Sequence, residues 1–336
     1  MKKYRLLVLT DHRGHSTENS IYPLLLEMRK HKRCAGIDVA SRGLENNRLF
    51  FENRAVKNLF AAPVSQTFAW DEAGSAFKKN LERVSPRTYD AVLLRLPHPV
   101  VEEFWGFLET EFPSVYFINN PAGMLKTGNK LFMLNFQELC PPMKACHSIE
   151  DIDEMRKQFP VVLKPVMSYG GKGIVRIKGD EVVFSEGEKM SFGQFAEAYH
   201  QHPEPYLAVK FLRNVTEGDK RIVVCCGEVL GAVLRYPPAD SWICNVAQGG
   251  SSAESAPDEN ELAIVARIDP VMRENGVIFY GIDTLCDDEG RRELSEINAL
   301  SIGGLHAMRT PAGVPATKRA AELLWERIYE EHKAEK

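Results

Sequence analysis

The 336-residue sequence lacks any apolar run that approaches the roughly 20 residues needed to span a bilayer. The apolar segment Leu6–Leu9 near the N-terminus is followed at once by polar residues and is too short for the hydrophobic core of a secretory signal. An excess of basic charge is also missing, because 42 Lys and Arg face 46 Asp and Glu, a formal net charge of −4. That balance argues against binding to nucleic acid or to an anionic membrane. We therefore expect a cytoplasmic protein with neither partner.

Cysteine is scarce and irregularly placed. The seven cysteines are odd in number, and no two of them show the spacing of a zinc knuckle or a CxxC redox motif. We therefore expect free thiols in a reducing compartment. Two nucleotide-binding signatures are absent as well, the Walker A loop G-x-x-x-x-G-K-S/T and the Rossmann fingerprint G-x-G-x-x-G. These two absences exclude a P-loop and a dinucleotide-binding Rossmann fingerprint.

What is present is the composition of an ordinary globular protein, with 44% hydrophobic and 26% charged residues. The first third of the chain alternates short apolar segments with helical patterns. We expect strands at Tyr4–Thr10, 90–95 and 115–119, and a helix capped by Ser16 or Thr17 after the first of them. Short apolar strands that alternate with helices predict a parallel sheet of βαβ units.

After residue 120 the pattern changes to helices, hairpins and longer strands. Helices are expected at about 130–139 and 149–158, and a strand pair at 161–165 and 174–177. From residue 206 onward strands dominate. The expected elements there are strands at Leu207–Leu212, Arg221–Cys226, Val229–Arg235, Val277–Thr284 and Glu293–Ala299, and a helix at Thr317–His332.

A glycine-rich segment follows the strand that ends at Lys164-Pro165. It contains Gly170, Gly171 and Gly173 within a few residues. Glycines let backbone N–H groups approach and wrap anionic oxygens, so the segment suits a loop that covers phosphates. An ordinary hairpin turn is the alternative interpretation.

Oxygen-bearing side chains gather near the C-terminal end. Glu296 and Asn298 lie two apart on an expected strand and share one face of it. If the strand with Asp283 lies alongside, two carboxylates and an amide converge, a donor set that suits Mg²⁺. Exposed carboxylates at strand ends are the alternative, but the apolar neighbours of Asp283 and Glu296 favour burial and hence a compensating cation.

Cationic residues open and close the preceding pair of strands. Asp219-Lys220-Arg221 begins one strand, and Arg235 ends the next. Buried cations beside a metal–phosphate centre would offset the charge that develops in phosphoryl transfer. Taken alone, the motif is only a charged turn.

Further short motifs complete a series along the chain. The series consists of Asn119-Asn120-Pro121, Asn129-Lys130-Leu131-Phe132, Leu163-Lys164-Pro165 with Gly170-Gly171, Gly218 to Arg221, Asn245, Ala247, Gly249 and Gly250, Gly281 and Asp283, and Glu296-Ile297-Asn298. In this order and spacing the motifs resemble those of the ATP-grasp ligases, and among them the bacterial glutathione synthetases. The resemblance runs over nearly the whole chain and is densest from Asn119 to Ser301.

The resemblance implies an ATP-grasp fold, of mixed α/β and α+β class, behind an N-terminal parallel-sheet (pre-ATP-grasp) domain. It implies a division into a substrate-side domain at 1–120, a central lid subdomain at 121–206 and a C-terminal subdomain with the metal site at 207–336. It also implies a homo-oligomer, a dimer or a tetramer.

The implied activity is that of an ADP-forming ligase, in which a carboxylate takes the γ-phosphate of ATP and an amine then displaces phosphate. By correspondence, Lys130 and Lys164 would bind the phosphates under the Gly170–Gly171 lid, and Asp283, Glu296 and Asn298 would hold Mg²⁺, with Mn²⁺ as the alternative ion. The adenine would lie against Val209, Lys210, Phe211 and Leu212, and Glu217 or Asp219 would bind the ribose. Arg221 and Asn245 would stabilise the acyl phosphate.

The substrate side departs from the glutathione synthetase pattern. Ile243 follows Trp242 where the family has an arginine, and the chain after Asn298 lacks the usual Ser-Pro-Thr and its following arginine, the nearest being Arg309. Arg95 keeps a strand-end position seen in the family. The resemblance thus leaves three functions open: glutathione synthesis from γ-glutamylcysteine and glycine, ligation of another carboxylate and amine in specialised metabolism or peptide tailoring, and a non-catalytic ATP-binding module. A kinase acting on a small hydroxyl compound is a weaker fourth.

Overall fold

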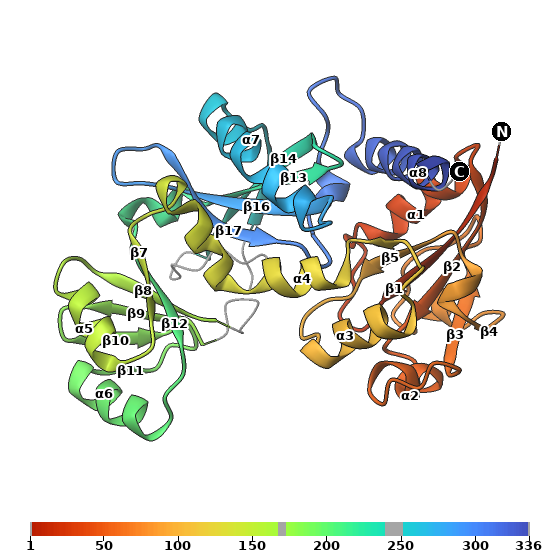
Figure 1. The fold of residues 1–336 in the computed structure, drawn as a ribbon. Helices are drawn as coiled ribbons and strands as arrows, with labels where there is room; N and C mark the ends of the chain where they lie inside the picture. Colours follow the sequence, from red (N-terminus) through yellow and green to blue (C-terminus); the bar gives the residue numbers. More distant parts are fainter. Residues whose placement is uncertain (1, 167–172, 239–250, 335–336) are drawn as a thin grey trace.

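The protein, seen in a computed structural model, is described for residues 2–166, 173–238 and 251–334. Three sheets follow one another along the molecule, with the first at one end, the second at the other and the third between them (Figure 1). Parallel and antiparallel sheets are thus combined, as the expected mixture of α/β and α+β structure requires. None of the helices in the described part of the chain is long and apolar enough to cross a membrane.

The first sheet has six strands in the order β4-β3-β2-β1-β5-β6. Its strands are β1 (Tyr4–Thr10), β2 (Cys34–Ser41), β3 (Leu59–Pro63), β4 (Glu82–Val84), β5 (Ala91–Arg95) and β6 (Phe117–Ile118). β1, β2, β5 and β6 are parallel, as predicted, and β3 and β4 extend the sheet in antiparallel fashion. The helices of this region are α1 (Ile21–Lys30), α2 (Arg48–Phe51) and α3 (Glu102–Glu111).

The cap predicted for α1 was wrong. The helix begins at Ile21 after Ser20, whereas Ser16 accepts a hydrogen bond from the Glu18 amide in a preceding turn. Ser16 and Thr17 therefore belong to the loop between β1 and α1. Side-chain oxygens of serine and threonine stabilise such turns as readily as helix starts, and the sequence does not separate the two.

The second sheet is antiparallel throughout, in the order β11-β10-β9-β8-β12-β7. Its strands are β7 (Met143–Cys146), β8 (Val161–Pro165), β9 (Val175–Lys178), β10 (Glu181–Phe184), β11 (Lys189–Ser191) and β12 (Tyr206–Lys210). α5 (Ile149–Arg156) and α6 (Phe192–Gln201) pack against it through Ile152, Phe195 and Tyr199. A capping box, formed by Ser191 and Gln194, starts α6.

The third sheet has five antiparallel strands in the order β15-β14-β13-β16-β17. They are β13 (Asp219–Cys225), β14 (Glu228–Tyr236), β15 (Ser251–Ser255), β16 (Phe279–Cys286) and β17 (Arg292–Asn298). α7 (Glu259–Glu274) packs on this sheet through Ile264, Ile268 and Met272. α4 (Pro121–Gly128) and the 3₁₀ segment η4 (Lys130–Leu139) run from the first sheet to the third (Figure 1). The predicted helix at 130–139 thus exists, but as 3₁₀ turns with a kink at Phe136.

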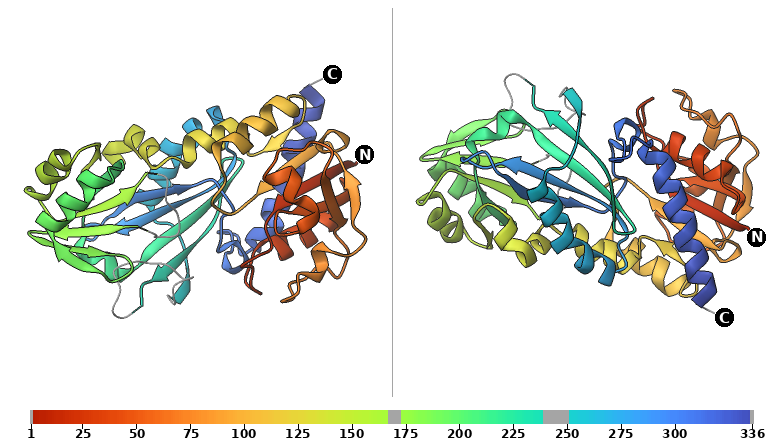
Figure 2. Two further views of the ribbon diagram at one scale, coloured as in Figure 1. Left: turned by 90° about the horizontal axis from the view of Figure 1, so that it is seen from below. Right: turned by 90° about the horizontal axis from the view of Figure 1, so that it is seen from above.

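The C-terminal helix α8 (Ala316–Ala334) returns to the N-terminal part of the chain. It lies alongside α1 (Figure 2), and the Trp325 indole N–H donates to the Met28 carbonyl at 2.9 Å. Trp325 is fully buried. The predicted division at residues 120 and 206 stays a prediction, but the last 20 or so residues of its third segment pack on the first sheet's helix.

Asn119 joins the first sheet to the third. Its side-chain oxygen accepts from the amides of Ile278 and Phe279, both at 2.9 Å. Its side-chain nitrogen donates to the carbonyls of Phe279 at 2.7 Å and Ala299 at 3.3 Å. Every polar atom of this buried amide is therefore used to hold β16 and the end of β17 against the end of β6.

α4 starts immediately afterwards and approaches the end of α7 very closely. Asn120 caps α4 by accepting from the Gly123 amide at 3.0 Å. A Cβ at Gly123 would lie 1.8 Å from the backbone oxygen of Asn275. Only glycine fits here, because the atom it would meet belongs to the backbone and cannot rotate away.

Gly123→Ala should therefore lower the free energy of unfolding by about 2 kcal/mol, as overpacking of a rigid contact does. Gly106→Ala on α3 is the matched control, since no atom lies within 4 Å of its added Cβ; loss of glycine's backbone entropy should raise stability by about 0.5–1 kcal/mol. Urea unfolding of both variants checks the pair. Equal midpoints for the two variants would contradict the close approach of α4 to α7.

Candidate active site

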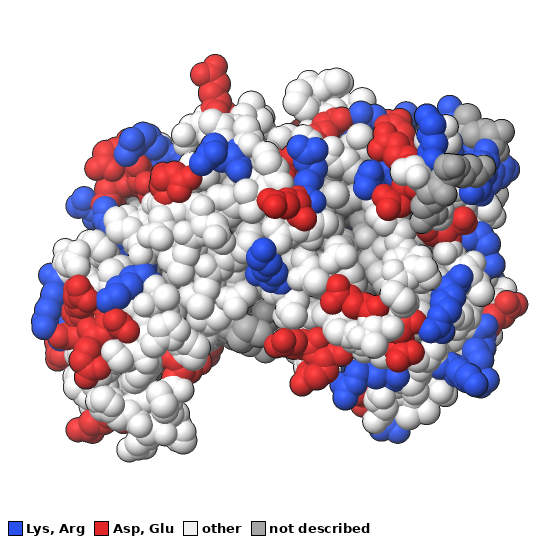
Figure 3. All heavy atoms as spheres, in the orientation of Figure 1, with Lys and Arg blue, Asp and Glu red and all other residues white. Residues whose placement is uncertain are grey.

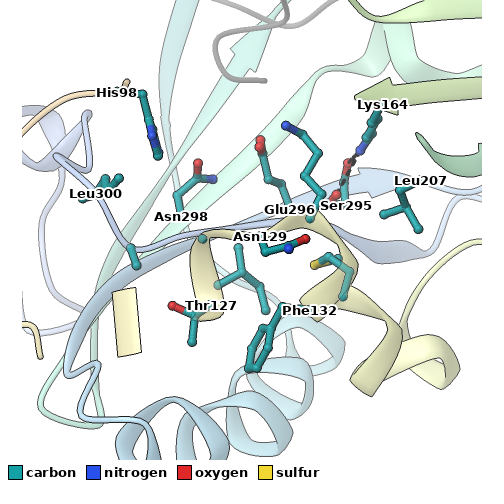
Figure 4. Close-up of a pocket in the computed structure, with 15 residues that line it drawn as sticks. His98, Thr127, Asn129, Phe132, Lys164, Leu207, Ser295, Glu296, Asn298 and Leu300 are labelled. Carbon is teal, nitrogen blue, oxygen red and sulfur yellow. Dashed lines mark hydrogen bonds between the residues drawn. The ribbon is translucent and has the colours of Figure 1, made fainter. Parts of the chain in front are cut away.

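A pocket lies where η4, β17 and β8 meet (Figure 4). Its lining includes Lys130 from η4, Lys164 from β8, and Glu296 and Asn298 from β17. His98, from the loop after β5, reaches the same pocket from the first sheet. One cavity therefore brings together four residues that the sequence analysis predicted for the site. They are two lysines, a carboxylate and an amide.

Lys164 connects the second sheet to the third. Its ammonium donates to the Ser295 carbonyl at 3.0 Å and lies 3.3 Å from the Ser295 hydroxyl (Figure 4). The partner atoms belong to β17, one residue before Glu296. The contact brings the cation of β8 to the strand that carries the acidic side chain.

Lys130 is partly buried. Burial lowers the pKa of its ammonium to about 8, the Lys164 charge acts in the same direction, and Glu296 opposes both. A partly dehydrated ammonium attracts a bound anion more strongly than a fully hydrated lysine does, because less water lies between the two charges to screen them.

The carboxylate of Asp283 is held by hydrogen bonds from three side chains. Its carboxylate is buried and accepts a bidentate pair from Arg221, Nε to Oδ1 at 2.8 Å and Nη2 to Oδ2 at 2.7 Å. Arg235 donates to Oδ2 at 2.9 Å, and Asn298 donates to it at 3.1 Å. Burial alone would raise the pKa of Asp283, but the two arginines outweigh it and hold the pKa well below its usual range.

Asp219 completes a chain of alternating charges. Arg235 donates to both of its oxygens, at 2.7 and 2.6 Å. Burial and the nearby Asp283 charge nevertheless raise the pKa of Asp219 to about 6. Asp219, Arg235, Asp283 and Arg221 thus form a network of two carboxylates and two guanidinium groups with no net charge. Both oxygens of Asp219, one of the two residues predicted to bind the ribose, are therefore paired with Arg235.

The three predicted metal ligands lie close together. β16 and β17 pair so that Asp283 faces Glu296 and Gly281 faces Asn298. In the described residues Asp283 Oδ1 accepts a single hydrogen bond, and the Asn298 amide donates through its nitrogen. Two carboxylates and an amide oxygen are hard oxygen ligands, so the set fits a Mg²⁺ or Mn²⁺ ion that also takes oxygens from water and phosphate. No group of three or more His, Cys, Asp or Glu able to hold a metal occurs within the described ranges.

The predicted adenine segment is a hinge between the second and third sheets. The amides of Lys210 and Phe211 donate to the carbonyls of Pro142 and Pro160, at 2.8 and 2.7 Å. Val209 and Leu212 are buried. Glu217 is exposed at the end of η5 (Arg213–Glu217). These two bonds hold the backbone at the end of β12 between the chain segments that lead into β7 and β8.

The predicted site residues Gly170, Gly171 and Asn245 lie outside the described residues, as do Trp242 and Ile243. Arg309, the arginine nearest to the motif after β17, is exposed and donates to the Gly313 carbonyl at 3.2 Å.

Sequence reasoning missed His98 as part of the pocket. Burial, with smaller effects from Lys130 and Arg42, lowers the pKa of its imidazole to about 3. The only signal in the sequence is its place between Pro97 and Pro99 after a strand, which marks a loop at a sheet edge. Arg95, noted at the end of β5, is fully buried and donates to the Ile302 carbonyl at 2.9 Å.

Arg235→Gln should leave two carboxylates facing each other out of water and lower the free energy of unfolding by about 3–5 kcal/mol. Because the pKa of Asp219 is raised in the folded state, the folded protein binds more protons than the unfolded chain, and stability should recover on acidification. Urea unfolding at about pH 7.5 and about pH 5.5 measures this recovery.

Arg319→Gln is the matched control. Arg319 also makes a bidentate pair, with Glu228, at 2.8 and 2.7 Å, but about a third of each side chain is exposed. The Arg319→Gln variant should lose about 1 kcal/mol or less of its free energy of unfolding. A comparable loss in the two variants, or no recovery of Arg235→Gln at the lower pH, would contradict the buried network.

Comparison with known proteins agrees with this geometry. The family described as prokaryotic glutathione synthetase, ATP-grasp domain, matches residues 129–312. The glutathione synthetase of Bradyrhizobium diazoefficiens is 32% identical over 257 residues, which cover 75% of this chain and 78% of that protein. The glutathione synthetase of Rhodopseudomonas palustris is 34% identical over 69% of this chain and 71% of its own.

The fold has solved counterparts as well. The crystal structure of D-cycloserine synthetase DcsG superposes with a TM-score of 0.65 over 96% of this chain and 99% of that one, at 14% identity. A D-alanine–D-alanine ligase from Bacillus anthracis, complexed with ATP, gives a TM-score of 0.57 over the full length of both chains, at 15% identity. These likenesses confirm the ATP-grasp fold. The chain belongs to the prokaryotic glutathione synthetase family, whose ATP-grasp domain makes it an ATP-dependent, ADP-forming carboxylate–amine ligase.

Proposed function

We propose that the protein joins γ-glutamylcysteine to glycine, and that the pocket around Lys130, Lys164 and Glu296 is where the γ-phosphate is transferred. The observation that carries the proposal is the meeting of two cations, from η4 and β8, with the acidic end of β17. Such a site recognises a metal–polyphosphate complex through charge on both sides. This substrate pair is supported by relatives that are named glutathione synthetase and whose similarity covers three quarters or more of this chain.

In the proposed reaction the substrate carboxylate attacks the γ-phosphorus, the bond between that phosphorus and the β-bridging oxygen breaks, and ADP leaves. The amine then attacks the acyl carbon, loses a proton, and phosphate departs with the former carboxylate oxygen. Lys130 and Lys164 hold the transferring phosphoryl group and offset its charge. No side chain becomes covalently bonded, so the protein acts by placing charges and by aligning the reactants.

Asp283, Glu296 and Asn298 would hold Mg²⁺, or Mn²⁺, which when bound neutralises phosphate charge. Arg221 is anchored on Asp283 and would present its remaining N–H groups to the acyl phosphate. Asn245 is proposed to assist from the segment after β14. The Gly170–Gly171 loop would cover the phosphates.

The remaining assignments belong to the same proposal. The hinge residues Val209, Lys210, Phe211 and Leu212 would read the adenine, with Glu217 or Asp219 at the ribose. Of these last two, Glu217 is the better placed, because Asp219 is paired with Arg235. The domains would divide at residues 120 and 206. A cytoplasmic dimer or tetramer that binds no nucleic acid is the form we propose for the cell.

A second substrate pair is favoured by the departures on the substrate side. Ile243 stands where the family has a cation, and Arg309 is exposed and bonded to its own loop. Apolar surface does not replace a cation that binds a substrate carboxylate. The alternative is thus an ATP-grasp ligase for a different carboxylate and amine.

Glu296→Gln should abolish ADP formation while leaving the unfolding midpoint near that of the native protein, because the side chain is only partly buried and its loss removes negative charge from the phosphate site. Asp283→Asn should be equally inactive, with a lower stability because two arginines lose their partner. Glu326→Gln, an exposed change on α8, is the control. Full turnover in Glu296→Gln would refute the assignment of the phosphate site.

The substrate pair is tested by ADP formation with ATP and Mg²⁺ over carboxylates crossed with amines, including γ-glutamylcysteine with glycine. We expect turnover that requires both, with glutathione detected by mass. Activity only with another pair would retain the ligase and reject glutathione synthesis. ATP binding without turnover on any pair would contradict the proposed reaction.

A further inference from the structure

The tight turn between β13 and β14 holds two adjacent cysteines. Cys225 is the last residue of β13, and Cys226 and Gly227 connect it to Glu228, the first residue of β14. Both connecting residues have positive φ, 53° at Cys226 and 85° at Gly227. Asparagine, aspartate and glycine are the usual residues at the first position of such a turn. The chain therefore carries a thiol where the backbone conformation favours other residue types.

This conformation brings the two sulfurs together. Adjacent side chains of an extended strand point to opposite faces, but the left-handed backbone at Cys226 turns its side chain, and the two sulfurs lie 3.9 Å apart. Both thiols are free. The turn is also held from outside, because the Cys226 amide donates to the Ile278 carbonyl at 2.7 Å and Glu228 is paired with Arg319 of α8. The packing around the turn thus fixes the sulfurs side by side.

The two thiols differ in exposure and in acidity. Cys225 is fully buried, and burial raises the pKa of its thiol well above the usual value. Cys226 is partly exposed, and a hydrogen bond from the Cys225 thiol lowers its pKa. Arg327 of α8 acts in the same direction, while burial opposes both. Because the thiolate is the nucleophile in thiol–disulfide exchange, Cys226 is the thiol suited to attack first.

The surroundings of Cys226 leave it open to a small charged reactant. Gly227 is exposed and has no side chain to cover the turn. The positive charge of Arg327 is opposed by the negative charges of Glu330 and Asp269. Acidic and basic side chains are likewise interspersed around α8 on the face that Figure 3 shows. An anionic peptide therefore meets no field of one sign here.

We propose that Cys225 and Cys226 form a reversible redox site, which a low-molecular-weight peptide disulfide such as glutathione disulfide oxidises to a disulfide bond. The Cys226 thiolate attacks one sulfur of the reactant, whose S–S bond breaks, and one glutathione leaves as its thiolate. The Cys225 sulfur then loses its proton and attacks the Cys226 sulfur, which releases the second glutathione. Two protein thiols are oxidised, one disulfide is reduced, and the two protons end on the two released glutathione molecules.

The bond should be easily reversed. The Cα atoms of adjacent residues are about 3.8 Å apart, less than the roughly 4.4–6.8 Å of ordinary disulfides. A disulfide between Cys225 and Cys226 is therefore strained, and strained disulfides are readily reduced. The site would respond to the thiol–disulfide balance around the protein instead of stabilising the fold. It does not depend on the proposed ligase reaction.

Peptide mass measurement tests the site directly. Trypsin, cleaving after Arg221 and Arg235, releases a peptide of residues 222–235 that contains both cysteines and no other. After the folded native protein has reacted with glutathione disulfide, we expect this peptide to lack two hydrogen atoms and to carry no glutathione. Excess reduced glutathione should restore both thiols. The reaction should be at least about 10-fold faster than that of Cys34, which is also partly exposed but whose pKa burial raises.

An unmodified peptide, a lasting glutathione adduct in the native protein, or a rate equal to that of Cys34 would overturn the proposal.

Substitutions separate the roles of the two thiols. Cys225→Ala should stop the reaction at a glutathione adduct on Cys226, and Cys226→Ser should leave the buried Cys225 reduced. Cys34→Ser is the matched control and should oxidise like the native protein. Reaction of Cys225 in the folded Cys226→Ser variant at the native rate would contradict the order of attack.

Phenylarsine oxide, which bridges two close thiols, tests the pair without any substitution. It should add one phenylarsenic group to peptide 222–235 of the native protein and block its oxidation by glutathione disulfide. Failure to bridge the two cysteines would contradict their placement side by side.

Discussion

The buried carboxylate of Asp283 is the interaction on which the site depends. It lies in the middle of the third sheet, and Arg221 of β13 and Arg235 of β14 both donate to it. An isolated charge in that position would be very unfavourable, so the arginines and the carboxylate require one another. The same carboxylate also holds Arg221, proposed to stabilise the acyl phosphate, and Asn298, proposed to bind the metal. The hydrogen bonds that stabilise the third sheet around Asp283 therefore also hold the proposed site residues in place.

Two further contacts bring distant parts of the chain to this centre. Asn119 holds the first sheet to β16 and β17, and Lys164 reaches from the second sheet to Ser295. The Lys164 contact is a pair of hydrogen bonds made by one side chain, whereas Asn119 is fully buried and uses all its polar atoms.

The sequence predicted most strands of the third sheet and half of those in the first two, because short apolar segments bounded by proline, glycine or polar residues are local signals. It did not predict β2, β3, β4, β7, β10, β11 and β15. It also placed Glu296 and Asn298 on one face, and it predicted convergence with Asp283 on the condition that the two strands pair, which the structure shows they do. It did not predict α7, although Asp258 and Glu261 form a capping box before an apolar pattern. Nor could it pair Arg235 with Asp283, 48 residues away, or bring His98 to the phosphate pocket, since such contacts depend on packing between sheets.

We propose that a carboxylate oxygen takes the γ-phosphoryl group of ATP at the centre formed by Lys130, Lys164 and Glu296. The transfer of oxygen from the carboxylate to phosphate is the step to measure. With the carboxylate substrate labelled by ¹⁸O, we expect inorganic phosphate to carry one ¹⁸O atom for every amide formed, and Glu296→Gln to give neither labelled phosphate nor amide. Phosphate free of label, released together with amide, would show that no acyl phosphate forms and would overturn the proposed reaction.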